Sequence, residues 1–219
     1  MDITTEVVSL GGITTAKSLG GGETRFYIPP IQRQYQWGPG CENAEDKNES
    51  ARIFLEDCIN FFDASRSIGD DPYFLGTMIV YQDKNDPDGK FHLMDGQQRW
   101  TTITALMSCI YHLLDRSASG KHGGTKAEIS KLFLTYEEDA QEKPRLVSDR
   151  DFDSYTIERL TEFKGNVPLA TLDPSDSSSG LKNTPRESFL TTYGRKNGTN
   201  LFCVSSYFLD RLCDRFSIK

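Results

Sequence analysis

The sequence predicts an α+β domain with added helices. Short runs of β-favouring residues, TRFYI, YFLGTMIVYQ and KFHLM, alternate with longer segments in which apolar residues recur every three or four positions. Hydrophobic residues make up 37% and charged residues 26% of the 219 residues, a mixture typical of a globular protein with its own core. Because no apolar run approaches the roughly 18 residues of a membrane span, we expect no membrane partner.

The first half of the chain predicts a strand, a helix and then two further strands. TRFYI (24–28) alternates like a strand, and IPPIQRQYQW (28–37) is extended because its prolines disfavour helix. YFLGTMIVYQ (73–82) and KFHLM (90–94) predict two strands joined by a turn-rich loop. Residues 51–65, which lie between IPPIQRQYQW and YFLGTMIVYQ, predict a helix with one apolar side. That side is Ile53, Phe54, Cys58, Phe61 and Phe62.

The second half predicts three helices and two short strands. The clearest helix begins near Trp100, with an apolar stripe over about four turns. Its members are Trp100, Ile103, Leu106, Met107, Ile110, Leu113 and Leu114. ISKLFLTY (129–136) and PRLVSD (144–149) resemble strands, and DFDSYTIERLTEF (151–163) resembles a helix. The last segment predicts a helix over 197–219 with another stripe. That stripe is Leu201, Val204, Phe208 and Leu212.

The whole chain, 1–219, is expected to form one domain. We expect its core in residues 1–160, and the Pro-, Ser- and Gly-rich stretch 164–188 to be a flexible loop before the last helix. Because the chain ends in mid-pattern, we expect it to be the N-terminal part of a longer protein. The N-terminus lacks a basic start followed by an apolar run, which predicts no signal peptide and a cytoplasmic protein.

Charge and the reactive residue types exclude several functions. A formal net charge of −7 argues against a sequence-blind nucleic-acid binder, although Arg25, Arg33 and Arg99 leave room for a local basic groove. The five cysteines form no Cys-x-x-Cys pair and are expected to be reduced thiols. They are Cys41, Cys58, Cys109, Cys203 and Cys213. The three histidines are scattered, so no histidine-based nuclease site is expected in this chain.

The segment IPPIQRQYQW allows two interpretations. In an extended chain the three glutamines at 32, 34 and 36 face away from Arg33, Tyr35 and Trp37. An arginine beside two aromatic residues could bind a phosphate and stack on a base. Alternatively, Tyr35 and Trp37 belong to the core and Arg33 forms a structural ion pair.

The segment HLMDGQQRWTTI (92–103) also has two interpretations. Asp95 followed by Gln98 three residues later fits a capping box, in which each side chain bonds a backbone amide at the start of the helix. A cap does not explain Gly96, Gln97 and Arg99. Free amides at a helix start, a glycine that permits close approach and an arginine are the parts of a phosphate site.

Three blocks in order, IPPIQRQYQW, YFLGTMIV and HLMDGQQRWTTITAL, resemble the N-terminal domain of GmrSD-type modification-dependent restriction systems. The family pattern runs I-P-x-aromatic-Q-R-x-Y-x-W, then F-L-G-small, then D-G-Q-Q-R-hydrophobic-T-T. The likeness extends loosely over nearly the whole chain. Two positions depart from it: Ile31 stands where the family often has an aromatic residue, and Trp100 where it usually has leucine.

The resemblance implies a nucleotide-binding core related to ParB and sulfiredoxin, with NTP hydrolysis at the DGQQR motif. It assigns catalysis to Asp95, Gln97, Gln98 and Arg99. Nucleotide binding falls to Gln32, Arg33, Gly96 and Thr101. Sensing of modified DNA falls to Ile31, Tyr35 and Trp37. We expect GTP or another NTP as substrate, together with Mg²⁺, for which Asp95 is a candidate ligand.

The implied partners are modified double-stranded DNA and an HNH-type nuclease domain or subunit, and the sequence leaves open whether the chain forms a homo-oligomer. Phosphorothioate DNA is favoured over glucosylated hydroxymethylcytosine as the recognised mark. A nucleotide- or DNA-binding module without hydrolysis is the alternative from another class. A sulfiredoxin-like redox enzyme would require a reactive cysteine near DGQQR, where Cys109 is the nearest in the sequence.

Overall fold

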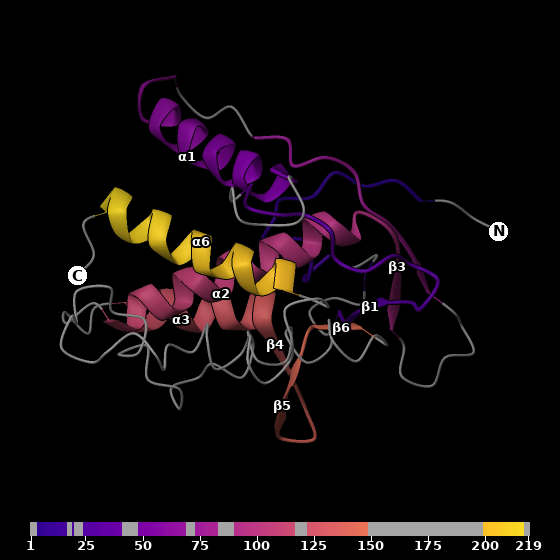
Figure 1. The fold of residues 1–219 in the computed structure, drawn as a ribbon. Helices are drawn as coiled ribbons and strands as arrows, with labels where there is room; N and C mark the ends of the chain where they lie inside the picture. The colour runs from indigo at the N-terminus through magenta and orange to yellow at the C-terminus, as the bar shows by residue number, and fades with distance from the viewer. Residues whose placement is uncertain are drawn as a thin grey trace, which may run out of the picture.

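The computed structural model of the chain describes residues 4–16, 19, 24–40, 48–68, 73–82, 90–116, 122–148 and 199–216. Within these ranges a mixed β-sheet packs against several helices, which confirms the α+β prediction. In Figure 1 the helices lie in layers on one side, with α1 outermost, and the sheet lies near the start of α2. The predicted helix at 151–163 and the predicted loop at 164–188 lie outside the described residues.

The main sheet has the strand order β2-β3-β1-β6, so β1 is a central strand. Its strands are β1 (Phe26–Ile28), β2 (Ile79–Gln82), β3 (Phe91–Asp95) and β6 (Leu146–Ser148). β1 runs parallel to both β3 and β6, whereas β2 and β3, the two strands predicted to be joined by a loop, pair in antiparallel fashion. A separate hairpin consists of β4 (Thr135–Glu138) and β5 (Gln141–Pro144).

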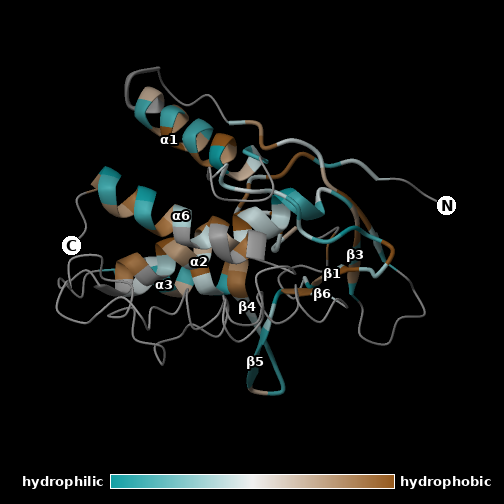
Figure 2. Cartoon of the chain, viewed as in Figure 1, coloured by the Kyte–Doolittle hydropathy of each residue, from teal (hydrophilic) through white to brown (hydrophobic). Residues whose placement is uncertain are grey.

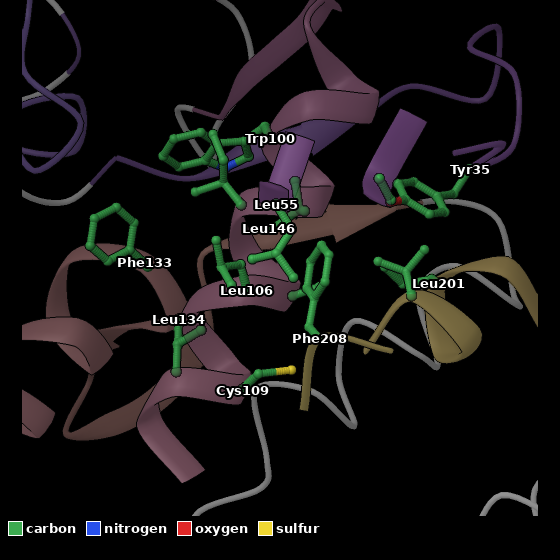
Figure 3. Close-up of a cluster of buried hydrophobic side chains, with 14 of the residues drawn as sticks. Tyr35, Leu55, Trp100, Leu106, Cys109, Phe133, Leu134, Leu146, Leu201 and Phe208 are labelled. Atoms are coloured by element: carbon green, nitrogen blue, oxygen red, sulfur yellow. The ribbon is translucent and has the colours of Figure 1, made fainter. Parts of the chain in front are cut away.

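Helix α2 is the centre of the fold. The helices are α1 (Ser50–Ile68), α2 (Gln97–Arg116), α3 (Gly123–Ile129), the π-helix η2 (Ser130–Leu134) and α6 (Thr199–Phe216). α2 packs against α3, η2 and α6. Figure 3 shows Trp100, Leu106 and Cys109 of α2 within the buried cluster that also holds Phe133 and Phe208. Because helices surround it, α2 also buries small polar residues. These are Thr101, Thr102, Thr104 and Ser108.

The apolar stripes predicted for α2 and α6 are confirmed, whereas that for α1 is only partly correct, because Phe54 packs against the core but Ile53 and Phe62 are exposed. All four stripe residues predicted for α6 are buried. In α1 the buried residues are Ala51, Leu55 and Ile59, while Ile53 is 50% and Phe62 45% exposed. The prediction was based on the large apolar side chains of α1 and overlooked Ala51. A small residue such as alanine lets the helix pack closely against its neighbours, so the buried face of α1 includes Ala51.

Two predicted strands differ from the structure. ISKLFLTY is helical as far as Leu134 and only then becomes β4. A short apolar run fits a buried helix as well as a strand, and here Ile129, Phe133 and Leu134 point into the core. YFLGTMIVYQ forms a strand only from Ile79 onward, because the left-handed φ of +97° at Gly76 interrupts the extended backbone.

Arg145 joins elements that are distant in sequence. Its guanidinium donates hydrogen bonds to the carbonyl oxygens of Lys131 in η2 (2.6 Å) and Thr24 before β1 (2.8 Å). The residue is only 2% exposed, and burial lowers the pKa of its guanidinium. Arg25, by contrast, is paired with Glu138 of the hairpin at 3.3 Å, so its charge is partly balanced within the fold.

The polar surface is distributed unevenly over the described helices. Figure 2 shows the outward side of α1 as hydrophilic and its inward side as more hydrophobic. The first turn of α2 is also hydrophilic in Figure 2, although the rest of that helix belongs to the core. In the part of the chain that the structure describes, none of the helices has the length and hydropathy needed to cross a membrane.

Candidate functional site

The three sequence blocks meet at the start of α2. We call this place the motif junction and define it as residues 31–37, 74–77 and 95–99. Its base is the carboxyl end of β3, which continues through Gly96 directly into α2. Gln32 donates a hydrogen bond from Nε2 to the carbonyl oxygen of Met94 at 3.0 Å, which fixes the first block to the end of β3. Segments more than sixty residues apart in the chain are therefore in direct contact.

Gln98 fastens the first block to the helix. Its Oε1 accepts a hydrogen bond from the backbone N–H of Gln36 at 2.7 Å, and its Nε2 donates to the carbonyl oxygen of Gln34 at 3.0 Å. The predicted capping box is therefore wrong, because the amide of Gln98 bonds another segment rather than the backbone at Asp95. Asp95 instead accepts a hydrogen bond on Oδ1 from the N–H of Gly96 at 2.8 Å.

Gln97 makes only half of the corresponding contacts. Its Nε2 donates to the carbonyl oxygen of Arg33 at 2.9 Å. Its Oε1 is buried and accepts no hydrogen bond from any of the described residues. A buried acceptor without a donor is costly, which makes it unusual in a folded protein. The two glutamines therefore differ. Both polar atoms of the Gln98 amide bond the first block, whereas Oε1 of Gln97 accepts no hydrogen bond from the described residues.

The aromatic residues of the first block lie largely in the core. Tyr35 is 7% exposed, and its hydroxyl is 2.6 Å from Oγ1 of Thr102. Figure 3 shows Tyr35 at the edge of the buried cluster. Trp37 is half-buried and its ring lies 6.2 Å from that of Phe54. Tyr35 and Trp37 therefore fit the interpretation in which they belong to the core. Their role in sensing DNA stays a prediction, and their burial does not favour it.

Several other residues of the first block face solvent. Ile31 is 78% exposed, and Arg33 and Gln34 are exposed as well. Phe74 of the second block is 77% exposed. The backbone of the first block thus bonds α2, while an apolar side chain and a cation remain available on its outer side. Of the residues predicted to sense DNA, Ile31 is the one placed to touch a ligand without rearrangement.

Arg99 lies against the second block. Its Nη1 donates a hydrogen bond to the carbonyl oxygen of Thr77 at 2.6 Å. A Cβ atom at Gly76 would lie 2.8 Å from Cζ of Arg99, closer than non-bonded atoms approach, so only glycine leaves room for the guanidinium. Gly76 and Thr77 were not among the predicted site residues, although the F-L-G-small block was the signal for them.

Gly96 permits the turn from β3 into α2. Its φ of +85° is in the left-handed region, which an L side chain rarely adopts. A Cβ there would also meet the Met78 side chain and the Thr77 carbonyl oxygen at 3.3 Å. Thr101, which was predicted to bind the nucleotide, is 3% exposed and lies one turn into the core-facing part of the helix.

A comparison with known families covers the stretch of sequence that contains the three blocks. The family described as the N-terminal domain of the GmrSD restriction endonuclease matches residues 16–205. The chain belongs to this family. The GmrSD N-terminal domain places it in a restriction system that acts against modified DNA and that includes a nuclease. No curated protein matches the chain in a sequence search.

No cysteine described in this GmrSD N-terminal domain is activated. Cys58, Cys109 and Cys213 are free thiols. Burial raises the pKa of Cys58 to about 11 and raises that of the fully buried Cys109 still further. Since the thiolate is the reactive form, a redox role of the sulfiredoxin kind gains no support from Cys109.

The reactivity of these thiols can be predicted from their pKa values. At pH 8 we expect iodoacetamide to label Cys58 about 100-fold more slowly than in the unfolded chain, because a pKa raised to about 11 lowers the thiolate fraction by roughly that factor. Raising the pH toward 11 should accelerate labelling of Cys58 and leave Cys109 protected. Peptide mass spectrometry measures both rates, and rapid labelling of Cys109 at pH 8 would contradict its burial.

An apolar cleft elsewhere in the GmrSD N-terminal domain offers few groups to a nucleotide among its described lining residues. A cleft of about 500 Å³ lies between α1, α2 and α6 and is lined almost entirely by Leu, Ile, Phe and Cys. Among the described residues of the lining, the titratable side chains are Cys58 and His122, which lies at the start of α3. The motif junction is therefore the better candidate for chemistry.

Proposed function

We propose that this chain is the sensor domain of an anti-phage restriction system, which binds and hydrolyses a nucleoside triphosphate, GTP being favoured, when it meets modified DNA. A separate HNH-type nuclease domain or subunit would then cut the DNA. The observation that supports this best is the convergence of the three family blocks at the start of α2, where the buried Oε1 of Gln97 has no donor among the described residues. Phosphorothioate is the favoured DNA mark.

The nucleotide phosphates would bind at the first turn of α2. The N–H groups at a helix start attract anions, and an arginine there is otherwise opposed by the helix dipole. Arg99 would neutralise the charge that develops on the transferring phosphoryl group. The site lies at the carboxyl end of β3, which is parallel to β1, as is usual for ligands of open α/β sheets. This position supports a core related to those of ParB and sulfiredoxin.

The two glutamines receive different roles in this proposal. Because both amide atoms of Gln98 are bonded to the first block, we assign it to positioning rather than to the reaction itself. The unused Oε1 of Gln97 can accept a hydrogen bond from an attacking water molecule, the role that a glutamine has in several NTPases. Its burial requires a small displacement of the first block before water arrives.

Magnesium fits the donor set at the motif junction. Asp95 is exposed and uses Oδ1 for the Gly96 N–H, so its second oxygen remains a candidate ligand. The described residues include no cluster of three or more His, Cys, Asp or Glu that could enclose a metal. Mg²⁺ with a nucleotide is normally held by one or two carboxylates and the phosphate oxygens, where it neutralises phosphate charge. Asp95 would supply the carboxylate.

Modified DNA would contact the outer side of the first block. Arg33 offers a cation for the DNA backbone, and Ile31 beside it offers an exposed apolar surface. A phosphorothioate sulfur is less hydrated than a phosphate oxygen, so it favours such a surface more than an unmodified phosphate does. This chemistry supports the phosphorothioate mark over a glucosylated base, whose hydroxyl groups require polar partners.

The test of this function is nucleotide turnover in the Arg99→Ala variant, measured as phosphate release with GTP and Mg²⁺, with and without phosphorothioate DNA. We expect kcat/KM to fall about 100-fold, because a preorganised charge at the reacting phosphate is lost. Arg52→Ala is the matched control. Arg52 lies on the surface of α1, pairs with Glu49, and should not change turnover. A thermal melt of each variant verifies folding.

Each result decides between hydrolysis and its alternatives. Turnover that is unchanged in Arg99→Ala overturns the site. Nucleotide binding by the wild-type chain without phosphate release would instead support a non-hydrolysing binding module. Stimulation by DNA containing glucosylated hydroxymethylcytosine, but not by phosphorothioate DNA, would reassign the recognised mark while leaving the nucleotide site intact.

A further inference from the structure

We propose that Gln98, Tyr35 and Thr102 form a latch that couples the DNA-facing first block to the start of α2. They are positioning residues: through them, engagement of DNA by residues 31–37 changes nucleotide affinity and turnover at residues 95–99. This inference rests on the proposed function for its two ligands. The three residues stand at positions of the family pattern, and the contacts that join them come from the structure.

The contacts form a continuous hydrogen-bonded series. Thr102 donates a hydrogen bond from Oγ1 to the carbonyl oxygen of Gln98 at 2.8 Å, and the same Oγ1 is 2.6 Å from the Tyr35 hydroxyl. Gln98 in turn bonds the backbone on both sides of Tyr35, at Gln34 and Gln36. One turn of helix and one extended segment are thus held at three consecutive residues of the first block.

Burial makes this connection stiff. Gln98, Thr102 and Tyr35 are 8%, 0% and 7% exposed. If the first block slid relative to α2, several buried polar groups would lose partners together, and buried polar groups without partners are strongly unfavourable. The block therefore has a strong preference for discrete positions relative to α2, which is the property that allows one site to influence another.

The nucleotide residues lie within this connection. Arg99 directly follows Gln98, and Gln97 directly precedes it while bonding the Arg33 carbonyl oxygen. A shift of the first block would change the position of Gln97 Oε1, which now lacks a donor. DNA pulling on the outer side of the block, where Ile31 and Arg33 are exposed, would thereby expose this acceptor to water or to the nucleotide.

The experiment uses the full chain and two substitutions at Thr102. Thr102→Val keeps the shape and removes the hydroxyl, whereas Thr102→Ser keeps the hydroxyl. Thr104→Val is the matched control, because Thr104 is equally buried in α2 and donates to the Trp100 carbonyl oxygen one turn earlier, as Thr102 does to Gln98. The readout is the ratio of the Kd of a non-hydrolysable GTP analogue without and with phosphorothioate DNA.

In the wild-type chain we expect DNA to change the nucleotide Kd by about tenfold, a usual size for coupled sites. Thr102→Val should bring the ratio close to one while the Kd without DNA changes by less than about twofold, because the hydroxyl is not a ligand of the nucleotide. Thr102→Ser and Thr104→Val should retain the wild-type ratio. Reciprocally, the nucleotide should change the DNA affinity by the same factor.

Failure of the latch and failure of the proposed hydrolysis are distinguishable. The latch is overturned if Thr102→Val has the same Kd ratio as the wild-type chain. It is also overturned if the Kd ratio of the wild-type chain itself is one. A ratio that Thr102→Val abolishes and Thr102→Ser rescues supports the latch even if no phosphate is released, since the readout is binding. Hydrogen exchange gives a second measure: exchange in residues 32–37 should rise in Thr102→Val and not in Thr104→Val.

Discussion

The Gly76→Ala variant is expected to lose as much nucleotide turnover as Arg99→Ala and, in addition, to lose about 1–3 kcal/mol of stability. Turnover falls because the new Cβ would lie 2.8 Å from Cζ and 3.0 Å from both terminal nitrogens of Arg99, so the guanidinium must leave the Thr77 carbonyl oxygen. Stability falls because φ at Gly76 is +97°, a conformation that alanine adopts only under strain.

The two effects are measured separately, by phosphate release and by urea denaturation. Gly124→Ala is the control, since its Cβ would enter open space in α3 and is expected to stabilise the helix by about 0.5–1 kcal/mol. The double variant Gly76→Ala with Arg99→Ala tests the mechanism. Once the guanidinium is absent, adding Gly76→Ala should lower turnover no further than Arg99→Ala alone does. Additive losses of turnover would mean that Gly76 acts elsewhere.

The parts of the fold that followed from the sequence are those with a long, regular pattern. α2 and α6 have stripes that extend over several turns, and their predicted residues form much of the core. Short apolar runs were less informative, as the helical Ser130–Leu134 shows. There the Ser130 and Thr135 hydroxyls lie 3.0 Å apart, so the helix end is held by a contact that no periodicity reveals.

The site shows the same limit at the level of single side chains. The motifs predicted which segments meet, since Gln32, Arg33, Gly96 and Arg99 all lie at or beside the motif junction. They did not predict what each amide bonds. An amide at a helix start can cap its own backbone or bond another segment, and which occurs at Gln98 depends on where residues 34–36 lie. Tertiary contacts decided this assignment.

The Arg145→Met variant is expected to lose about 3–5 kcal/mol of stability, because two charge-assisted hydrogen bonds disappear and the two carbonyl groups that accept them lose a donor. Those carbonyl groups belong to Thr24 and Lys131. Methionine retains the apolar stem, so the loss should reflect the polar contacts rather than a cavity. Urea denaturation measures the change. Lys143→Met, on the neighbouring hairpin strand and 41% exposed, should cost far less, because solvent screens its ion pair with Glu138.

The backbone around Arg145 explains why the loss should not remain local. Its N–H donates to the Leu134 carbonyl oxygen at 2.9 Å, and its own carbonyl oxygen accepts from the Phe26 N–H at 2.7 Å. The residue thus connects η2 to the central strand β1, on which β3 and the start of α2 depend. In conditions where Arg145→Met remains folded, nucleotide affinity should equal that of the wild type, since these four hydrogen bonds of Arg145 go to residues 24, 26, 131 and 134 rather than to residues 95–99. A selective loss of nucleotide affinity, with stability unchanged, would instead place Arg145 in the ligand site.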